Sequence, residues 1–527
     1  MAGSTLFHTV CALAATTLVA AWPACAAPAT DVPTWYRATS EHFIAYSDQS
    51  PADTTRRLKA LEQFRLFAPR LLPDAPGASS DGEPTLYLLN DVDSLSYVAS
   101  NEVAGLYSAC REGRLLFSAD GLLDRRPRHL DRARPLQDTG LTLLFHEYSH
   151  HLMLRGGPTP YPLWYTEGLA EYLSTFTYDG QAGHFGAPPY RDQWLLARVN
   201  WGEWDRVLAP DDKLSSGLTS TPQADPAIFY AKAWLLTHYM LSDPARARAL
   251  QAYFDRLRLG EDPVAAFKTA TGIDPIHDLP QRLHDYSRNL PTIDYALPAS
   301  PDTPVSITTL PATTDSYIMG SAALQTCPAP QTGRAMLKTL KSDVGPMAGT
   351  DERTALAYGE ILFGDPKAPI DDLTAISPGD SLYPRAQYLL GRAWLAAGDR
   401  GRAAAYLEKA LSLSPADPPT LYFLAHADEA RPGVPAERAL DEALTAARAV
   451  PSVYDYAAYA ARLELQDGDR ERAQALLRPF TIDLRAPVHA QHVAAIATAI
   501  GQGKTATEVG AMMDTLSQST PAGTAAP

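Results

Sequence analysis

The chain has little cysteine and no excess of positive charge. Only 4 of its 527 residues are cysteines, and its 45 Lys and Arg residues are outnumbered by 60 Asp and Glu residues, which gives a formal net charge of -15. Cys110 and Cys327 form no disulfide framework and have no Cys or His at metal-ligand spacing, so we expect buried, idle thiols. The acidic balance argues against a nucleic-acid partner, which would need a basic face.

Long apolar runs are also missing beyond the N-terminus, so we expect no membrane span in the mature chain. The apolar stretch from Leu6 to Ala21 is shorter than the ~20 residues of a spanning helix and leads into Ala24-Cys25-Ala26, a small-x-small cleavage pattern. Residues 1–26 therefore predict a secretory signal peptide and a periplasmic or secreted protein. Because the segment lacks Lys and Arg, an uncleaved membrane anchor stays open as an alternative.

The length predicts two or three domains. Residues 30–290 mix short apolar runs with helical periodicity and are expected to form an α+β domain. Its first elements are expected at 42–46, 54–72, 85–89, 103–108, 114–118 and 139–154. Residues 291–331 are rich in Pro, Thr and Ser with little periodicity, which predicts a linker.

Helical pairs with an internal repeat follow over residues 332–515. Between Pro384 and Pro415, small and apolar residues fall near the offsets of the tetratricopeptide pattern, and Gly398-Asp399-Arg400 recurs as Gly468-Asp469-Arg470. Such pairs stack because none can bury its apolar face alone. We expect an all-α repeat domain that binds a protein partner or substrate, followed by a disordered tail over 516–527.

The residues that carry chemistry begin with a His-Glu-x-x-His motif at 146–150, within a predicted helix. Residues four apart lie on the same side of a helix, so His146 and His150 point to one spot and can hold a divalent metal. Glu147 sits beside that spot as a base for water. The motif therefore predicts a catalytic zinc site.

A second predicted helix supplies what the first one lacks. A three-ligand catalytic zinc site needs one more ligand and an open position. After a turn at 155–158, Glu167 and Glu171 share one face of this helix. Glu167 is the predicted third ligand, and Glu171, one turn further on, is placed to accept a hydrogen bond from a ligand histidine.

Through His-Glu-x-x-His at 146–150 and Trp-x-x-Glu-Gly-x-Ala at 164–170, the sequence resembles the gluzincin metallopeptidases. This clan includes thermolysin and the aminopeptidase N family, and the sequence looks most like its smaller peptidase MA-like bacterial relatives. The resemblance covers residues 34–290. It implies a zincin-like peptidase domain with one zinc ion per chain, Glu147 as general base and Glu171 as support for a ligand.

A third segment, Phe229-Tyr230-Ala231-Lys232-Ala233, is similar to the aminopeptidase N segment Tyr-x-Lys-Gly-Ala. In that family the tyrosine stabilises the tetrahedral intermediate, which implies the same role for Tyr230, although Ala233 replaces the expected glycine. The Gly-x-Met-Glu-Asn segment that holds a substrate's free amine is missing. Residues 103–107 stand in its place as an edge strand against which a peptide could lie.

The sequence thus predicts zinc-dependent hydrolysis of peptide or protein substrates. Two alternatives stay open. The chain could be a non-catalytic binding or scaffold protein on a zincin fold, or a zinc hydrolase that acts on a non-peptide substrate. The intact Glu147 argues against the first alternative, because a purely structural metal site needs no base.

Overall fold

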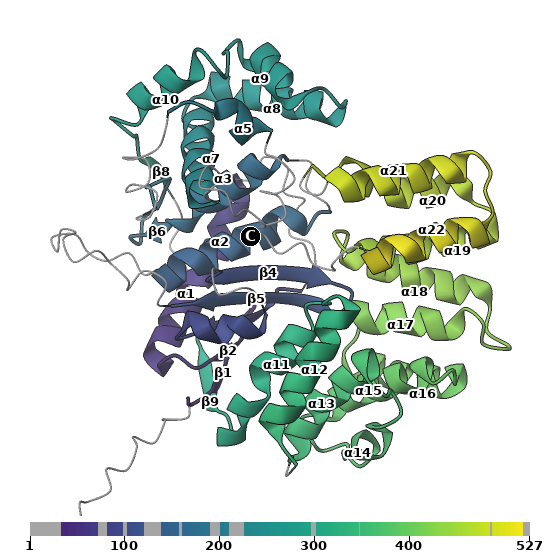
Figure 1. Ribbon diagram of the computed structural model, residues 1–527. Coiled ribbons are helices and arrows are strands. Elements are labelled where there is room, and N and C mark those ends of the chain that lie inside the picture. Colours follow the sequence, from purple (N-terminus) through teal and green to yellow (C-terminus); the bar gives the residue numbers. More distant parts are fainter. Residues whose placement is uncertain are drawn as a thin grey trace, which may run out of the picture.

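The structure, a computed structural model, describes ten stretches of the chain. They are residues 33–71, 82–98, 103–120, 139–157, 161–189, 201–209, 226–296, 302–346, 348–484 and 487–519. The predicted signal peptide, residues 1–26, lies outside them. No helix within these stretches combines the length and the apolar character needed to cross a membrane. Figure 1 shows a sheet-containing part and, beside it, a stack of helices formed by the C-terminal residues.

A six-stranded sheet forms the middle of the first part. Its strands run in the order β4-β5-β3-β2-β1-β9, in which β2, β3 and β5 are parallel and the other pairings are antiparallel. The bounds are β1 Tyr36–Thr39, β2 Ile44–Ser47, β3 Thr85–Leu89, β4 Gly105–Cys110, β5 Gly113–Ala119 and β9 Ser306–Thr309. The elements expected at 103–108 and 114–118 are confirmed as strands and form a hairpin, whose first strand, β4, is an edge of the sheet.

Alternating side chains give the sheet two buried faces. Leu86 and Leu88 pack toward helices α1 (Pro51–Phe67) and α2 (Thr139–Leu154), where the rings of Phe64 and Phe145 stack with centroids 4.4 Å apart. Tyr87 and Leu89 point the other way and share a core with α11 (Ile318–Leu324). Because side chains alternate along each strand, one face of the sheet packs on α1 and α2 and the other face packs on residues beyond 310.

Helices cover the side of α2 that faces away from the sheet. Helix α3 (Leu163–Ser174) lies against α7 (Pro226–Leu241) so closely that a Cβ on Gly168 would collide with Ala233 O and Thr237 Oγ1. A small sheet, β6 (Thr177–Tyr178), β7 (Ala182–Phe185) and β8 (Ile293–Ala296), borders this part. The remaining helices are α5 Trp204–Leu208, α8 Pro244–Arg258, α9 Pro263–Thr271 and α10 Leu279–Tyr286.

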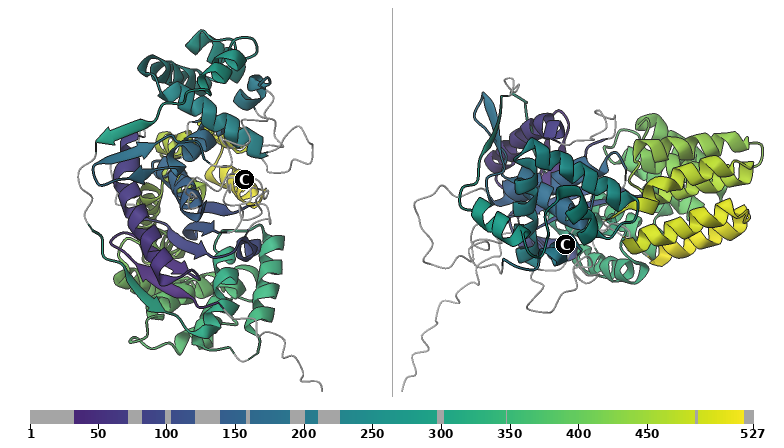
Figure 2. Two further views of the ribbon diagram at one scale, coloured as in Figure 1. Left: turned by 90° about the vertical axis from the view of Figure 1, so that its left-hand side faces the viewer. Right: turned by 90° about the horizontal axis from the view of Figure 1, so that it is seen from above.

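The C-terminal residues form helix pairs stacked side by side along one side of the first part (Figures 1 and 2). A Cβ on Gly391 of α15 would collide with Leu407 of α16, which explains the small residue in the repeat, and the turns at Gly398 and Gly468 have φ of 84° and 93°. The helices are α12 Pro330–Val344, α13 Thr350–Phe363, α14 Ile370–Thr374, α15 Tyr383–Ala396, α16 Arg400–Leu413, α17 Pro418–Asp428, α18 Ala436–Ala449, α19 Tyr454–Asp467, α20 Arg470–Leu477, α21 Pro487–Gly501 and α22 Ala506–Ser519.

The described residues of the segment 291–331, which was predicted as a linker, instead contribute strands and a helix to the fold. Strand β8 pairs with β7, strand β9 pairs with β1, and α11 packs on the sheet. The strands are only four residues long and are flanked by prolines, so they leave little local periodicity, and their pairing partners lie far away in the sequence. Helix α22 also extends past residue 515 into the segment predicted as a tail.

Cys110 and Cys327 form a disulfide, which corrects the expectation of idle thiols. The bridge joins the end of strand β4 to the segment between α11 and α12. The sequence could not show this, because the two cysteines are 217 residues apart and nothing local marks them as neighbours. A disulfide of this kind persists in oxidising compartments.

Removing this disulfide is expected to destabilise the protein without changing its fold. A bridge that closes so long a loop limits the unfolded chain strongly, so the Cys110→Ser/Cys327→Ser variant should lose about 2–5 kcal/mol of unfolding free energy. Urea unfolding of the variant, and of the wild-type protein with and without reductant, measures this loss. Equal stability of all three samples, or a free thiol at Cys110 under native conditions, would contradict the assignment.

Candidate metal centre

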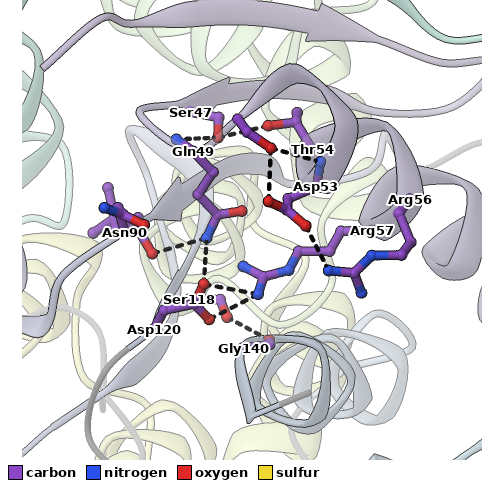
Figure 3. Close-up of polar contacts among 12 residues, drawn as sticks. Ser47, Gln49, Asp53, Thr54, Arg56, Arg57, Asn90, Ser118, Asp120 and Gly140 are labelled. Carbon is purple, nitrogen blue, oxygen red and sulfur yellow. Dashed lines mark hydrogen bonds and ion pairs between the residues drawn. The ribbon is translucent and has the colours of Figure 1, made fainter. Parts of the chain in front are cut away.

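The start of helix α2 is fixed to the sheet by a polar network (Figure 3). The buried guanidinium of Arg57, from α1, binds both oxygens of Asp120 at 2.7 and 2.9 Å, and Ser118 Oγ donates to Gly140 O at 2.8 Å. A Cβ on Gly140 would collide with Asp120 and Arg57, so α2 begins in direct contact with this ion pair. Arg57 of α1 and the end of β5 therefore hold the N-terminal end of α2 in place.

Two faces of α2 carry the polar residues of the predicted motif. His146 and His150, four residues apart, turn toward Glu167 of α3. Glu147 and His151, also four apart, turn toward strand β4. Buried helices α2 and α3 thus place three polar side chains between them, each with less than a tenth of its surface exposed.

The three predicted metal ligands converge on one point. Nε2 of His146 and Nε2 of His150 are 3.1 Å apart, and each lies 3.4 Å from Oε2 of Glu167. Donor atoms bound to one zinc ion at 2.0–2.1 Å in tetrahedral geometry are about 3.3–3.4 Å apart. The three separations fit that value, and in the described part of the chain this is the one group of His, Cys, Asp and Glu residues arranged to hold a metal ion.

The buried surroundings of the Glu167 carboxylate also suit a bound cation. Its side chain is fully buried, yet neither carboxylate oxygen accepts a hydrogen bond of normal geometry from the described residues. Burial works to raise the pKa of this carboxyl, but the imidazoles of His150 and His146 lower it well below its usual range. A buried anion facing two imidazole nitrogens is a costly arrangement in an apolar interior, and a divalent cation would compensate it.

Glu171 and Tyr230, also predicted from the sequence, lie beside the three ligands. Glu171 Oε1 is 3.4 Å from Nδ1 of His146, so this carboxylate favours a proton on Nδ1 and leaves Nε2 free as a ligand atom. The ring of Tyr230, on α7, meets the His146 ring edge to face with centroids 6.2 Å apart. The structure therefore brings the three ligands, Glu171 and Tyr230 together from three helices, and Glu147 follows His146 directly on α2.

Strand β4 passes directly over Glu147, a contact that the sequence analysis did not identify. A Cβ on Gly105 would come within 2.7 Å of Glu147 Oε1, and the hydroxyl of Tyr107 lies 3.1 Å from Nδ1 of His151. Two residues along a strand and four residues along a helix both advance about 6 Å. Gly105 and Tyr107 of β4 can therefore contact Glu147 and His151 of α2, respectively. A glycine within a strand signals close backbone approach, which was the one available clue.

The carboxylate of Glu83 contacts the side of α2 that carries Tyr148 and His151. Glu83 accepts from Tyr148 Oη at 2.8 Å and from Arg65 Nε at 2.7 Å, and it lies 3.3 Å from Nε2 of His151. Burial works to raise the pKa of Glu83, but His151 and the hydrogen bonds from Arg65 and Tyr148 lower it to about 2. His151, the residue after ligand His150, is therefore held away from the metal face.

Comparisons of this chain with protein-family models, with curated proteins and with solved structures find no match. The function of the chain is therefore inferred from the geometry of the site.

Proposed function

We propose that this chain is an exported zinc metallopeptidase of the gluzincin type, with a zincin-like domain followed by tetratricopeptide-like helix pairs. The observation that carries the proposal is the convergence of two imidazole nitrogens and one carboxylate oxygen at 3.1–3.4 Å, with Glu147 on the same helix. A structural zinc site has four protein ligands, whereas a catalytic site has three and an open position. Three ligands accompanied by a carboxylate base favour catalysis.

His146, His150 and Glu167 would hold the zinc ion. When bound, the ion would supply Lewis acidity, polarising a carbonyl group and making water more acidic. Glu147 would accept a proton from the attacking water at its carboxylate and later deliver it to the leaving amine. The hydroxyl group of Tyr230 would donate a hydrogen bond to the carbonyl oxygen on which negative charge develops.

The edge strand supports a peptide as the substrate. Strand β4 is paired with β5 on one side only among the described strands, and its Gly105 lies against Glu147. An extended peptide that adds to the edge of β4 opposite β5 would gain main-chain hydrogen bonds and would pass next to the base. This arrangement favours cleavage within an extended chain.

Export is supported by two independent features. Residues 1–26 read as a signal peptide, and the disulfide between Cys110 and Cys327 suits an oxidising compartment such as the periplasm or the extracellular space. The helix pairs would assist either substrate capture or recruitment of a protein partner.

The proposal is tested by incubating purified protein, with and without a chelator, with a library of unstructured peptides. Mass spectrometry of the products should show internal cleavage that the chelator abolishes and that added zinc restores. If peptides stay intact while ester or other amide substrates are turned over in a zinc-dependent way, the chain is a hydrolase of another substrate class. If no substrate reacts although zinc is bound, a non-catalytic binding protein is favoured.

A further inference from the structure

The tip of the β4–β5 hairpin is buried in the stack of helix pairs. Glu112, at the turn, accepts from both terminal nitrogens of Arg392 on α15 at 2.7 and 3.1 Å. The side chains are 1% and 6% exposed, and the Arg392 guanidinium lies 3.6 Å from the ring centroid of Phe423 on α17. A buried, bidentate ion pair thus joins the two parts of the molecule.

Further contacts hold the same turn. Tyr456 on α19 donates to Arg111 O at 2.9 Å, and the Arg111 guanidinium lies 3.5 Å from Asp455. The disulfide of Cys110 fixes the residue just before the turn. Helices α15, α17 and α19 are the first members of three successive pairs, so the surface that they form together is occupied by the chain's own hairpin.

The other end of strand β4 lies at the candidate metal centre. Gly105 contacts Glu147, and the hydroxyl of Tyr107 meets His151, whereas Glu112 is seven residues further along the same hairpin. Pairing with β5 keeps the hairpin extended, and its tip is about 23 Å from Gly105. The stack of helix pairs therefore holds one end of a short strand whose other end determines the space around Glu147.

We propose that Glu112 and Arg392 are positioning residues, which hold edge strand β4 against Glu147 by fixing the hairpin tip in the helical stack. This inference rests on the proposed peptidase function for its kinetic consequence, but not for its structural one. Loss of the pair would loosen β4 and so weaken the binding of extended peptides along it. The three metal ligands, which come from α2 and α3, would be unaffected.

The test compares full-length Arg392→Met with the matched control Arg462→Met. Arg462 pairs at 3.0 Å with Glu429, and both residues belong to the helical stack. Hydrogen exchange followed by mass spectrometry should show amides of residues 105–110 exchanging roughly tenfold faster in Arg392→Met, because a buried carboxylate loses its partner. Exchange in α2 and the zinc content should match wild type, and Arg462→Met should leave β4 unchanged.

Kinetics provide the second measurement. For Arg392→Met, KM for an extended peptide should rise at least severalfold with kcat little changed, and Arg392→Lys, which keeps the charge, should recover part of the loss. Unchanged exchange in β4 of a folded Arg392→Met or, if that variant does not fold, of Glu112→Gln, which removes the charge from the other partner, would overturn the inference. Faster exchange in a protein that cleaves no peptide would support the positioning role and contradict the proposed function instead.

Discussion

Glu147→Gln is expected to abolish most turnover while the metal stays bound. The amide keeps the size of the carboxylate, which matters because Gly105 leaves little room beside it, but it cannot accept the proton of the attacking water. We expect kcat to fall roughly 10³–10⁴-fold, the upper part of the range for one positioned acid–base group. Steady-state cleavage of a peptide identified from the library, with zinc analysis of the same sample, measures both effects.

The matched control is Glu62→Gln. Glu62 is also a buried glutamate, and it lies on helix α1. It accepts hydrogen bonds from Ser40 and from the backbone of His42, which lie between β1 and β2, away from strand β4. Its replacement should cost stability and leave kcat near the wild-type value. Activity of Glu147→Gln within a few-fold of wild type would place the base elsewhere and contradict the mechanism.

Tyr230→Phe is expected to have the second largest effect. Its hydroxyl can help only when negative charge has developed on the carbonyl oxygen, so its loss should affect the transition state more than the bound substrate. We expect kcat to fall roughly 10²–10³-fold with KM little changed, as for one lost oxyanion donor. Zinc content and the unfolding midpoint should not change, because the ring that packs against His146 is retained.

Tyr239→Phe provides the control on the same helix. Tyr239 packs against Tyr286 and under the guanidinium of Arg246, away from the metal ligands, and its hydroxyl should contribute little to turnover. Tyr165 lies on α3, two residues before Glu167. If Tyr230→Phe has no effect and Tyr165→Phe inactivates the protein, the similarity to the aminopeptidase N segment was coincidental. The metal site would stand, but the assignment of the oxyanion donor would not.

The candidate site was predictable because its signal is local. The spacing of His146 and His150, and of Glu167 and Glu171, places each pair on one helix face, and the structure has both helices where periodicity put them. Tyr230 needed a motif as well, because a single tyrosine on a helix says little. That α2 and α3 lie side by side was predicted from chemistry, because a zinc site with two histidine ligands on α2 needs a third ligand, which Glu167 on α3 can provide.

The long-range features were not predictable in the same way. Strand β9 pairs with β1 across some 270 residues of chain, the disulfide spans 217, and Glu112 meets Arg392 after 280. Nothing in the local sequence around Glu112 distinguishes an exposed turn residue from a buried one. The helix pairs were predicted from the spacing of the sequence repeat. That the β4–β5 hairpin packs against these helices was not, because this contact depends on the packing of the whole molecule.

The central claim, a zinc ion held by His146, His150 and Glu167, is tested most directly by metal analysis of purified protein after dialysis against metal-free buffer. Wild type and His184→Ala, which changes an exposed histidine paired with Asp179 and Asp294, should each retain about one zinc ion per chain. The His146→Ala/His150→Ala/Glu167→Ala variant should retain almost none while its helical circular dichroism persists. Stoichiometric zinc in that triple variant would contradict the account.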